Sequence, residues 1–294
     1  MPPSGEAVRS RRLGSLLEIH FAVFLFGFPG LFGKWLPLAP HLIVFGRVLF
    51  ATLALALVLA LGRRSVRVAV VPDAVLLILC GFVLSAHWTM FFKAVQVSTV
   101  AVALLSYSSF PVFTAFLEPM AFKESWDPWS IVLALLTAAG VYLIIPRAGL
   151  AGPVFLGVGW GLGAGLTFSI LSLLNRRLAR RNPSLTVAFY QDLWAAIFLL
   201  PFAVLSRPQF TGSDIGLLAL LGVFGTAGAH TLFINGMKRI SARTASIISS
   251  LEPVYGIVLA FLFLKERPSP RTILGGALIL AAALIVTLKA RRSS

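Results

Sequence analysis

The sequence has few charged residues and almost no cysteine. Only 12% of its 294 residues are charged, about half the share that is usual for a water-soluble domain. The single cysteine, Cys80, excludes an intrachain disulfide and a cysteine metal site. The four histidines form no His-x-x-x-His pair, and no acidic pair has ligand spacing, so no metal is expected. No phosphate-binding loop is present either, and no cofactor is expected.

Apolar residues dominate instead. They make up 58% of the chain, and the mean hydropathy is +0.93. A helix needs roughly 20 apolar residues to cross a bilayer, and lipid cannot satisfy an open backbone. The sequence therefore predicts an all-α integral membrane protein with ten transmembrane helices. Its apolar spans lie near 16–35, 41–61, 73–94, 99–119, 129–146, 154–175, 184–206, 214–236, 244–264 and 271–289.

The net charge of +15 reports topology rather than a nucleic-acid partner, because the basic residues form short clusters between the apolar spans. With a cytoplasmic N-terminus, seventeen of the 25 Lys and Arg residues fall inside, seven fall outside and Arg47 lies within a span. Cytoplasmic loops carry the excess of such residues. We expect a multi-pass protein of the inner (cytoplasmic) membrane with both termini in the cytoplasm. No cleavage site follows the N-terminal arginines, so the first span is expected to stay uncleaved.

One segment of the sequence occurs twice. SSFPVFTAFLEPMAFKE begins at Ser108 and SLEPVYGIVLAFLFLKE at Ser250, 142 residues later, and the ungapped match covers 94–124 and 236–266. Five helices per copy is an odd number, so the second copy must cross the membrane in the opposite sense. The sequence predicts two inverted five-helix repeats, residues 1–147 and 148–294. Transporters built in this way bind their substrate near mid-membrane, between the repeats.

Several motifs resemble those of the EamA type of the drug/metabolite transporter superfamily. They are the repeated Pro-Val-aromatic motif with its closing Lys-Glu at 123–124 and 265–266, GRVLFA at 46–51, and LNRRLARRNPSLTVAFYQDLWAAIFLLP at 174–201. The resemblance implies ten helices, an inverted repeat and a central cavity that opens alternately to either side. It also implies export or uptake of small metabolites, among them amino acids and drug-like amines.

We therefore expect a secondary transporter, and more specifically an exporter of a small polar or aromatic metabolite such as an amino acid. Its energy would come from the substrate gradient or from coupled protons, because no ATP-binding motif is present. A passive channel or facilitator is one alternative. A membrane enzyme is another, but it needs converging catalytic groups, and the sequence offers no such set, so we expect no enzyme.

Glu252 is the sharpest candidate for function. It lies about nine residues into the ninth span, roughly 13 Å deep at 1.5 Å per residue. An ionisable residue at such depth is costly and by default functional. The first copy of the repeat has Phe110 at the equivalent position. Glu252 is suited to carrying a coupled proton, and equally to a structural tie with Arg47.

Further polar and aromatic residues fall near mid-membrane and complete the expected substrate site. The simpler interpretation is that the histidines bridge helices and the serines pack between them. Three prolines beside these positions are candidate hinges: Pro29, Pro111 and Pro253. The expected substrate-binding residues are His87, Trp88, Tyr107, Ser108, Trp160, Tyr190, Gln191, His230, Ser249 and Glu252.

Two other charged residues fall within spans. Arg47 suits a substrate carboxylate, but we expect it to snorkel to the interface or to form a structural ion pair. Asp192 is expected to pair with a loop arginine, Arg176 or Arg177. Glycines recur every four residues from 157 to 165, which predicts a close-packing ridge on one helix face.

Overall fold

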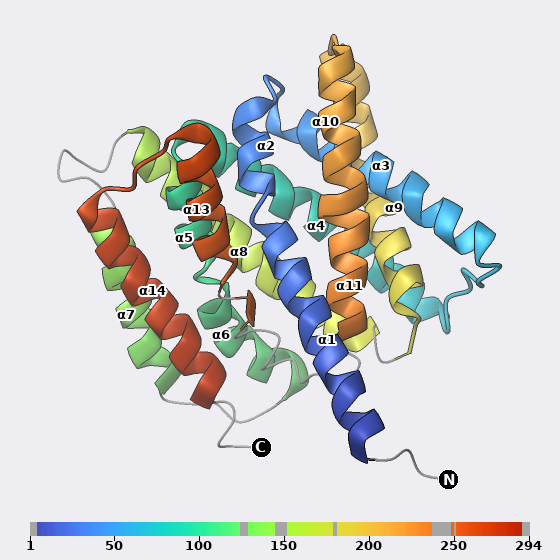
Figure 1. Ribbon diagram of the computed structural model, residues 1–294, viewed down its shortest axis with the longest axis horizontal. Coiled ribbons are helices and arrows are strands. Elements are labelled where there is room, and N and C mark those ends of the chain that lie inside the picture. Colours follow the sequence, from blue (N-terminus) through green and yellow to red (C-terminus); the bar gives the residue numbers. More distant parts are fainter. Residues whose placement is uncertain are drawn as a thin grey trace.

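The computed structural model describes residues 5–123, 129–144, 152–178, 181–236, 248–249 and 251–289. Within these ranges every regular element is a helix, and the helices pack as a bundle (Figure 1). In chain order they are α1 (Gly5–Phe26), α2 (Pro29–Trp35), α3 (Pro40–Leu61), α4 (Val71–Val97), α5 (Val100–Tyr107), α6 (Phe110–Phe122), α7 (Trp129–Ile144), α8 (Pro153–Leu178), α9 (Ser184–Ser206), α10 (Gly212–Gly222), the π-helix η1 (Val223–Gly228), α11 (Ala229–Gly236), α13 (Glu252–Leu264) and α14 (Pro270–Lys289). The start of α1 and the end of α14 lie at the same end of the bundle, at the bottom of the view.

The described helices include seven stretches that are long and apolar enough to cross a membrane, judged by length and composition. Three shorter apolar helices lie where the fifth, ninth and tenth spans are expected. The all-helical membrane architecture is thereby confirmed. The seven stretches are Gly14–Trp35, Pro40–Leu61, Val71–Val97, Val100–Phe122, Pro153–Leu178, Ser184–Ser206 and Gly212–Phe233, and the shorter helices are Val132–Ile144, Glu252–Leu264 and Pro270–Ala282.

The three prolines expected to act as hinges all lie in the first turn of a helix. Pro29 begins α2 after the break that follows α1, and Pro111 is the second residue of α6 after the break that follows α5. Pro253 is likewise the second residue of α13. Proline has no N–H and disfavours a helical residue before it, so it is accommodated where a helix begins. Hinge motion at these breaks stays a prediction.

The helices α6 and α13 have the same bounds relative to the repeated sequence. α6 begins at Phe110 and α13 begins at Glu252, 142 residues later. Each helix is 13 residues long and has a proline at its second position. The two helices therefore reproduce in structure the ungapped match between the two copies of the sequence.

Corresponding helices also end in the same way. Lys123 (φ 55°) ends α6 and Lys265 (φ 59°) ends α13, both in the left-handed conformation. Arg63 (φ 47°) follows α3 and Arg207 (φ 44°) follows α9. These four are the positive-φ non-glycine residues of the described chain, and this conformation is uncommon outside glycine. A cation is favourable there because a helix C-terminus carries a partial negative charge.

The glycines of α8 form the expected close-packing ridge. Gly157, Gly161 and Gly165 lie on one face of the helix. A Cβ at Gly161 would lie 2.6 Å from the Ser106 Cβ, and a Cβ at Gly165 would lie 2.9 Å from the Tyr107 carbonyl oxygen. Because no larger side chain fits, α8 lies directly against α5 and the residues that follow it.

Replacing Gly161 with leucine is expected to lower the free energy of unfolding by about 1–3 kcal/mol, the usual cost of overpacking. The matched control is Gly159→Leu on the same helix, because a Cβ at Gly159 meets no atom within 4 Å. Thermal denaturation of the purified variants in detergent compares the two. Equal melting temperatures for both variants would contradict the close contact between α8 and α5.

Candidate functional site

Arg47 lies at the centre of a polar cluster inside the bundle. It belongs to α3 and has no exposed surface. Its Nε and Nη2 donate to Thr226 Oγ1 of η1 at 3.0 and 2.8 Å. Its Cζ lies 3.6 Å from the centroid of the Trp88 ring on α4. Snorkelling of Arg47 to the interface, expected from the sequence, is therefore wrong, since this side chain has no exposed surface and contacts η1 and α4.

Two buried acids belong to the same cluster. Asp192 of α9 is 1% exposed and Glu252 of α13 is 6% exposed. Among the described residues neither carboxylate forms an ion pair with Arg47, so the expected structural ion pair is not formed, but both acids lie near enough for their charges to act on its guanidinium. The expected pairing of Asp192 with a loop arginine is wrong, because Asp192 is buried in the interior and Arg176 forms its ion pair with Glu118.

The cluster has unused hydrogen-bonding capacity. Arg47 Nη1 and both carboxylate oxygens of Asp192 are buried, and none of these atoms has a hydrogen-bond partner among the described residues. An unpaired polar group in a low-dielectric interior costs free energy. Intramembrane ionisable residues are retained mainly where they bind a substrate, an ion or a proton. The free donor on Arg47 and the free acceptors on Asp192 therefore mark the candidate site.

The π-helix positions the threonine that holds Arg47. Thr226 lies in η1, between α10 and α11, and its hydroxyl donates to the Leu221 carbonyl at 3.2 Å, five residues earlier. π-turns inside α-helices occur frequently at functional sites. Sequence reasoning missed both Thr226 and the central place of Arg47. Depth within a span was the available signal for Arg47 and Asp192, whereas no pattern pointed to the π-turn.

Aromatic side chains form a wall beside the charges. The His87 ring lies 4.9 Å from the Trp88 ring, 5.5 Å from the Tyr107 ring and 5.3 Å from the Phe168 ring, measured between centroids. His87 Nδ1 donates to the Ala164 carbonyl on α8 at 2.9 Å. The hydrogen bond across helices that the sequence predicts for His87 is confirmed, and it fixes this histidine within the aromatic wall.

Three more of the expected residues lie close to this wall or to the charges. Tyr107 and Glu252 interact electrostatically. His230, partly exposed on α11, interacts electrostatically with Arg47 and packs its ring 5.5 Å from Phe26. Glu252 thus joins the aromatic wall to the charge cluster through Tyr107.

The remaining expected residues are spread more widely. Ser108 is buried and donates to the Leu104 carbonyl of its own span at 2.8 Å, and Ser249 is also buried. Gln191 is buried and its Nε2 donates to Asn175 Oδ1, and the Tyr190 ring packs edge to face against its neighbour Phe189. Trp160 lies on α8 and is 39% exposed. The structure does not bring Trp160 into the cluster.

Polar contacts tie the helix ends beyond the cluster. Lys34 Nζ donates to the Ser98 carbonyl at 2.7 Å, and Glu266 Oε2 accepts the Val100 amide at 2.9 Å. Burial raises the pKa of Glu266, while the Val100 N–H and the charge of Lys34 act in the opposite direction. The first contact joins α2 to the residue after α4, and the second joins the start of α5 to the segment after α13.

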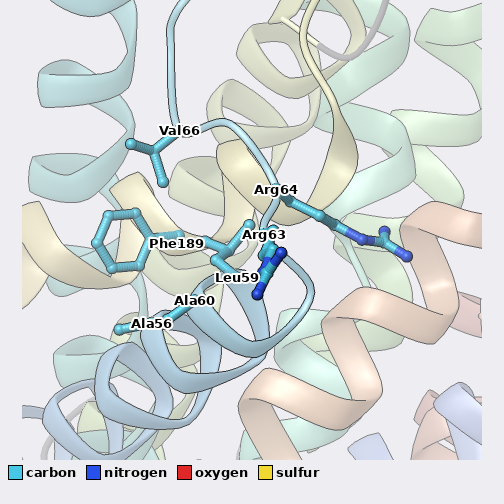
Figure 2. Close-up of a pocket in the computed structure, with 7 residues that line it drawn as sticks. All are labelled: Ala56, Leu59, Ala60, Arg63, Arg64, Val66 and Phe189. Carbon is cyan, nitrogen blue, oxygen red and sulfur yellow. The ribbon is translucent and has the colours of Figure 1, made fainter.

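Two surface pockets lie at the ends of helices. One, of about 250 Å³, is at the end of α3 (Figure 2), and the other, of about 450 Å³, is between α2 and α3. Neither pocket is lined by a residue of the charge cluster. Arg47, Trp88, Asp192 and Glu252 are at most 6% exposed, so the cluster is enclosed within the bundle.

The two copies of the sequence match the same family model. The model described as the EamA-like transporter family matches residues 14–145 and again residues 155–288. The chain belongs to the EamA-like transporter family. The resemblance seen in the motifs is confirmed, and the family points to membrane transport rather than enzymatic catalysis.

This EamA-like protein has relatives that are named as transporters. It is 26% identical over 283 residues to an uncharacterized transporter of Bacillus subtilis, covering 94% of this chain and 90% of that one. It is 25% identical over 221 residues to an S-adenosylmethionine uptake transporter of Rickettsia conorii, covering 74% of this chain and 72% of the relative. A crystal structure 22% identical in sequence matches with a TM-score of 0.68, over 95% of this chain and 98% of that one, and shares the fold.

Proposed function

We propose that this EamA-like protein is a secondary transporter whose substrate binds at the cluster of Arg47, Asp192 and Glu252. One observation carries the proposal: the cluster combines a buried cation with two buried acids and retains free donors and acceptors. Its members come from both copies of the sequence, with Arg47 and Trp88 in the first and the acids in the second. Transporters with inverted repeats bind their substrate at such an interface.

The proposed topology has ten spans. The three shorter apolar helices complete the seven longer stretches, giving five spans in residues 1–147 and five in residues 148–294. An even number of spans agrees with Figure 1, in which the start of α1 and the end of α14 lie at the same end of the bundle. The excess of Lys and Arg in the loops on that side supports a cytoplasmic position for that end of the bundle. Alternating access would then move helices about the breaks at Pro29, Pro111 and Pro253.

The substrate class follows from the charges of the site. Arg47 Nη1 is a free donor for a carboxylate, and the Asp192 oxygens are free acceptors for an ammonium group. The rings of Trp88, Tyr107 and Phe168 provide an apolar wall beside them. A small zwitterion with an apolar or aromatic part, such as an amino acid, matches the Arg47 donor, the Asp192 acceptors and the apolar wall. The relative named for S-adenosylmethionine uptake adds that compound to the candidates.

Liposomes containing the purified chain test the proposal. They are preloaded with one unlabelled candidate at a time, and uptake of the same radiolabelled compound is measured for a panel of amino acids, amines and S-adenosylmethionine. We expect saturable counterflow for a zwitterionic member of the panel, and none in empty liposomes. Flux that neither saturates nor exchanges would instead favour a passive channel. Export, the direction predicted from the sequence, is tested by comparing right-side-out with inverted membrane vesicles.

A further inference from the structure

A pocket with two arginines lies at the end of α3, away from the charge cluster. Figure 2 shows Phe189 and Val66 on one side of the pocket, Arg63 beside Leu59, and Arg64 beyond it with its side chain extending away from Phe189 and Val66. The pocket has a volume of about 250 Å³. Its lining residues are Ala56, Leu59, Ala60, Arg63, Arg64, Val66 and Phe189. The pocket therefore has a cationic side and an apolar side.

The backbone of the two arginines is held in place. The Arg63 amide donates to the Ala60 carbonyl at 3.0 Å, and the Arg64 amide donates to the Leu59 carbonyl at 2.9 Å. These bonds complete the last turn of α3 and use carbonyls that a helix end leaves free. Arg63 is in the left-handed conformation, so the chain turns sharply here and both side chains leave the helix at its end.

The segment that follows is tied to α9. Asn182, just before α9, accepts the Ala69 amide at 3.0 Å and donates to Asp73 Oδ2 at 2.8 Å. The Thr186 hydroxyl of α9 donates to the Ser65 carbonyl at 3.4 Å. These bonds join the segment after α3 to α9, the helix that carries Phe189, and to Asn182, which precedes it.

The two positive charges of the pocket are not neutralised by the protein. Among the described residues, neither Arg63 nor Arg64 has a carboxylate within ion-pair distance. Asp73, the acid in the first turn of α4, is bonded by Asn182. Both arginines are exposed, and they follow directly on a helix that is apolar enough to span the membrane. A phosphate in the bilayer surface lies within reach of such side chains.

We propose that this pocket binds the headgroup of an anionic phospholipid. The guanidinium groups would hold the phosphate, because their planar donors match its oxygens. Phe189, Val66 and Ala56 would contact the apolar part next to the headgroup. A volume of about 250 Å³ is below the usual range for a whole ligand, so the acyl chains stay in the bilayer. Basic pockets between membrane helices bind anionic headgroups by the same chemistry. The proposal is independent of the transported substrate.

Native mass spectrometry of the full chain in detergent tests the inference, with phosphatidylglycerol as the probe and phosphatidylcholine as the neutral comparison. Each basic side chain near an anionic headgroup contributes several-fold to affinity, so losing two lowers it about thirtyfold. The double variant Arg63→Gln/Arg64→Gln should show that loss. Arg207→Gln is the matched control, because Arg207 is also exposed, left-handed and at the end of the corresponding helix. It should bind phosphatidylglycerol as the unmodified protein does.

Three outcomes would overturn the inference. The first is equal retention of the two lipids by the unmodified protein, a comparison that needs no variant to fold. The second is unchanged phosphatidylglycerol affinity in the double variant, or in Arg64→Gln alone if the double variant elutes as an aggregate. The third is displacement of the lipid by inorganic phosphate at an equal concentration, which would assign the pocket to a free anion.

Discussion

Transport by the Arg47→Gln variant is expected to fall about a hundredfold, because truncating one partner of a buried charge pair costs several kcal/mol of binding. The substrate loses its guanidinium donor, and Asp192 and Glu252 lose their buried counter-charge. Folding also suffers, since an uncompensated buried charge typically costs about 3–5 kcal/mol. Counterflow in liposomes measures the first effect, and thermal denaturation in detergent measures the second.

Further variants separate binding from folding. Arg47→Lys keeps the charge but loses the paired contact to Thr226 and the planar stacking on Trp88, so stability should recover more than transport. Arg47→Met combined with Asp192→Asn removes charges of both signs and should melt above Arg47→Met alone, without regaining transport. Arg176→Gln is the control, because its ion pair with Glu118 is partly exposed and worth at most about 1 kcal/mol. Normal counterflow by Arg47→Gln would disprove a substrate site at this cluster.

Replacing Glu252 with glutamine is expected to remove the coupling of transport to protons. A glutamine keeps the size and an acceptor oxygen but cannot take up or release a proton. A pH gradient should then no longer drive accumulation of the substrate, while counterflow at equal pH survives. Glu252 is buried, interacts with Arg47 and Tyr107, and is replaced by Phe110 in the other copy of the repeat. It is therefore a charged member of the cluster with no charged counterpart in the other copy of the repeat.

The matched control for this variant is Glu118→Gln, at the surface of the bundle on α6. It removes a carboxylate without touching the cluster, so pH-driven accumulation should persist. Accumulation driven by pH in the Glu252→Gln liposomes would show that any proton is carried elsewhere. Loss of both counterflow and pH-driven accumulation would assign Glu252 to substrate binding rather than to proton coupling.

Helix positions, the helix starts at the prolines and the repeat could all be predicted from the sequence. Hydropathy locates a span because lipid tolerates only apolar helices. A proline in the first turn marks a helix start because it has no amide hydrogen to donate, as at Pro29, Pro111 and Pro253. The copies at an offset of 142 residues became α6 and α13 with equivalent bounds, since the same local sequence folds in the same way.

The arrangement of the site could be predicted only in part. In a membrane protein, lipid-facing and interior-facing residues are both apolar, so hydropathy does not show which face of a helix is buried. The sequence therefore predicts Trp160 in the site although it is 39% exposed, and predicts Arg47 at the interface or in an ion pair although it is fully buried and forms no ion pair among the described residues. Glu252 and His87 were recognised because a polar residue deep in a span is informative wherever it points.

The extra residue in the π-helix η1 sets the direction in which the side chains of α11 point relative to those of α10. A π-turn holds one residue more than an α-helical turn, and each residue of an α-helix turns the chain by about 100°. If the same six residues, Val223–Gly228, formed a regular α-helix instead, α11 would be rotated by about that angle. His230 and Asn235 would then turn away from Phe26 and Glu18 on α1. The π-turn thus lets one span contact α3 through α10 and α1 through α11.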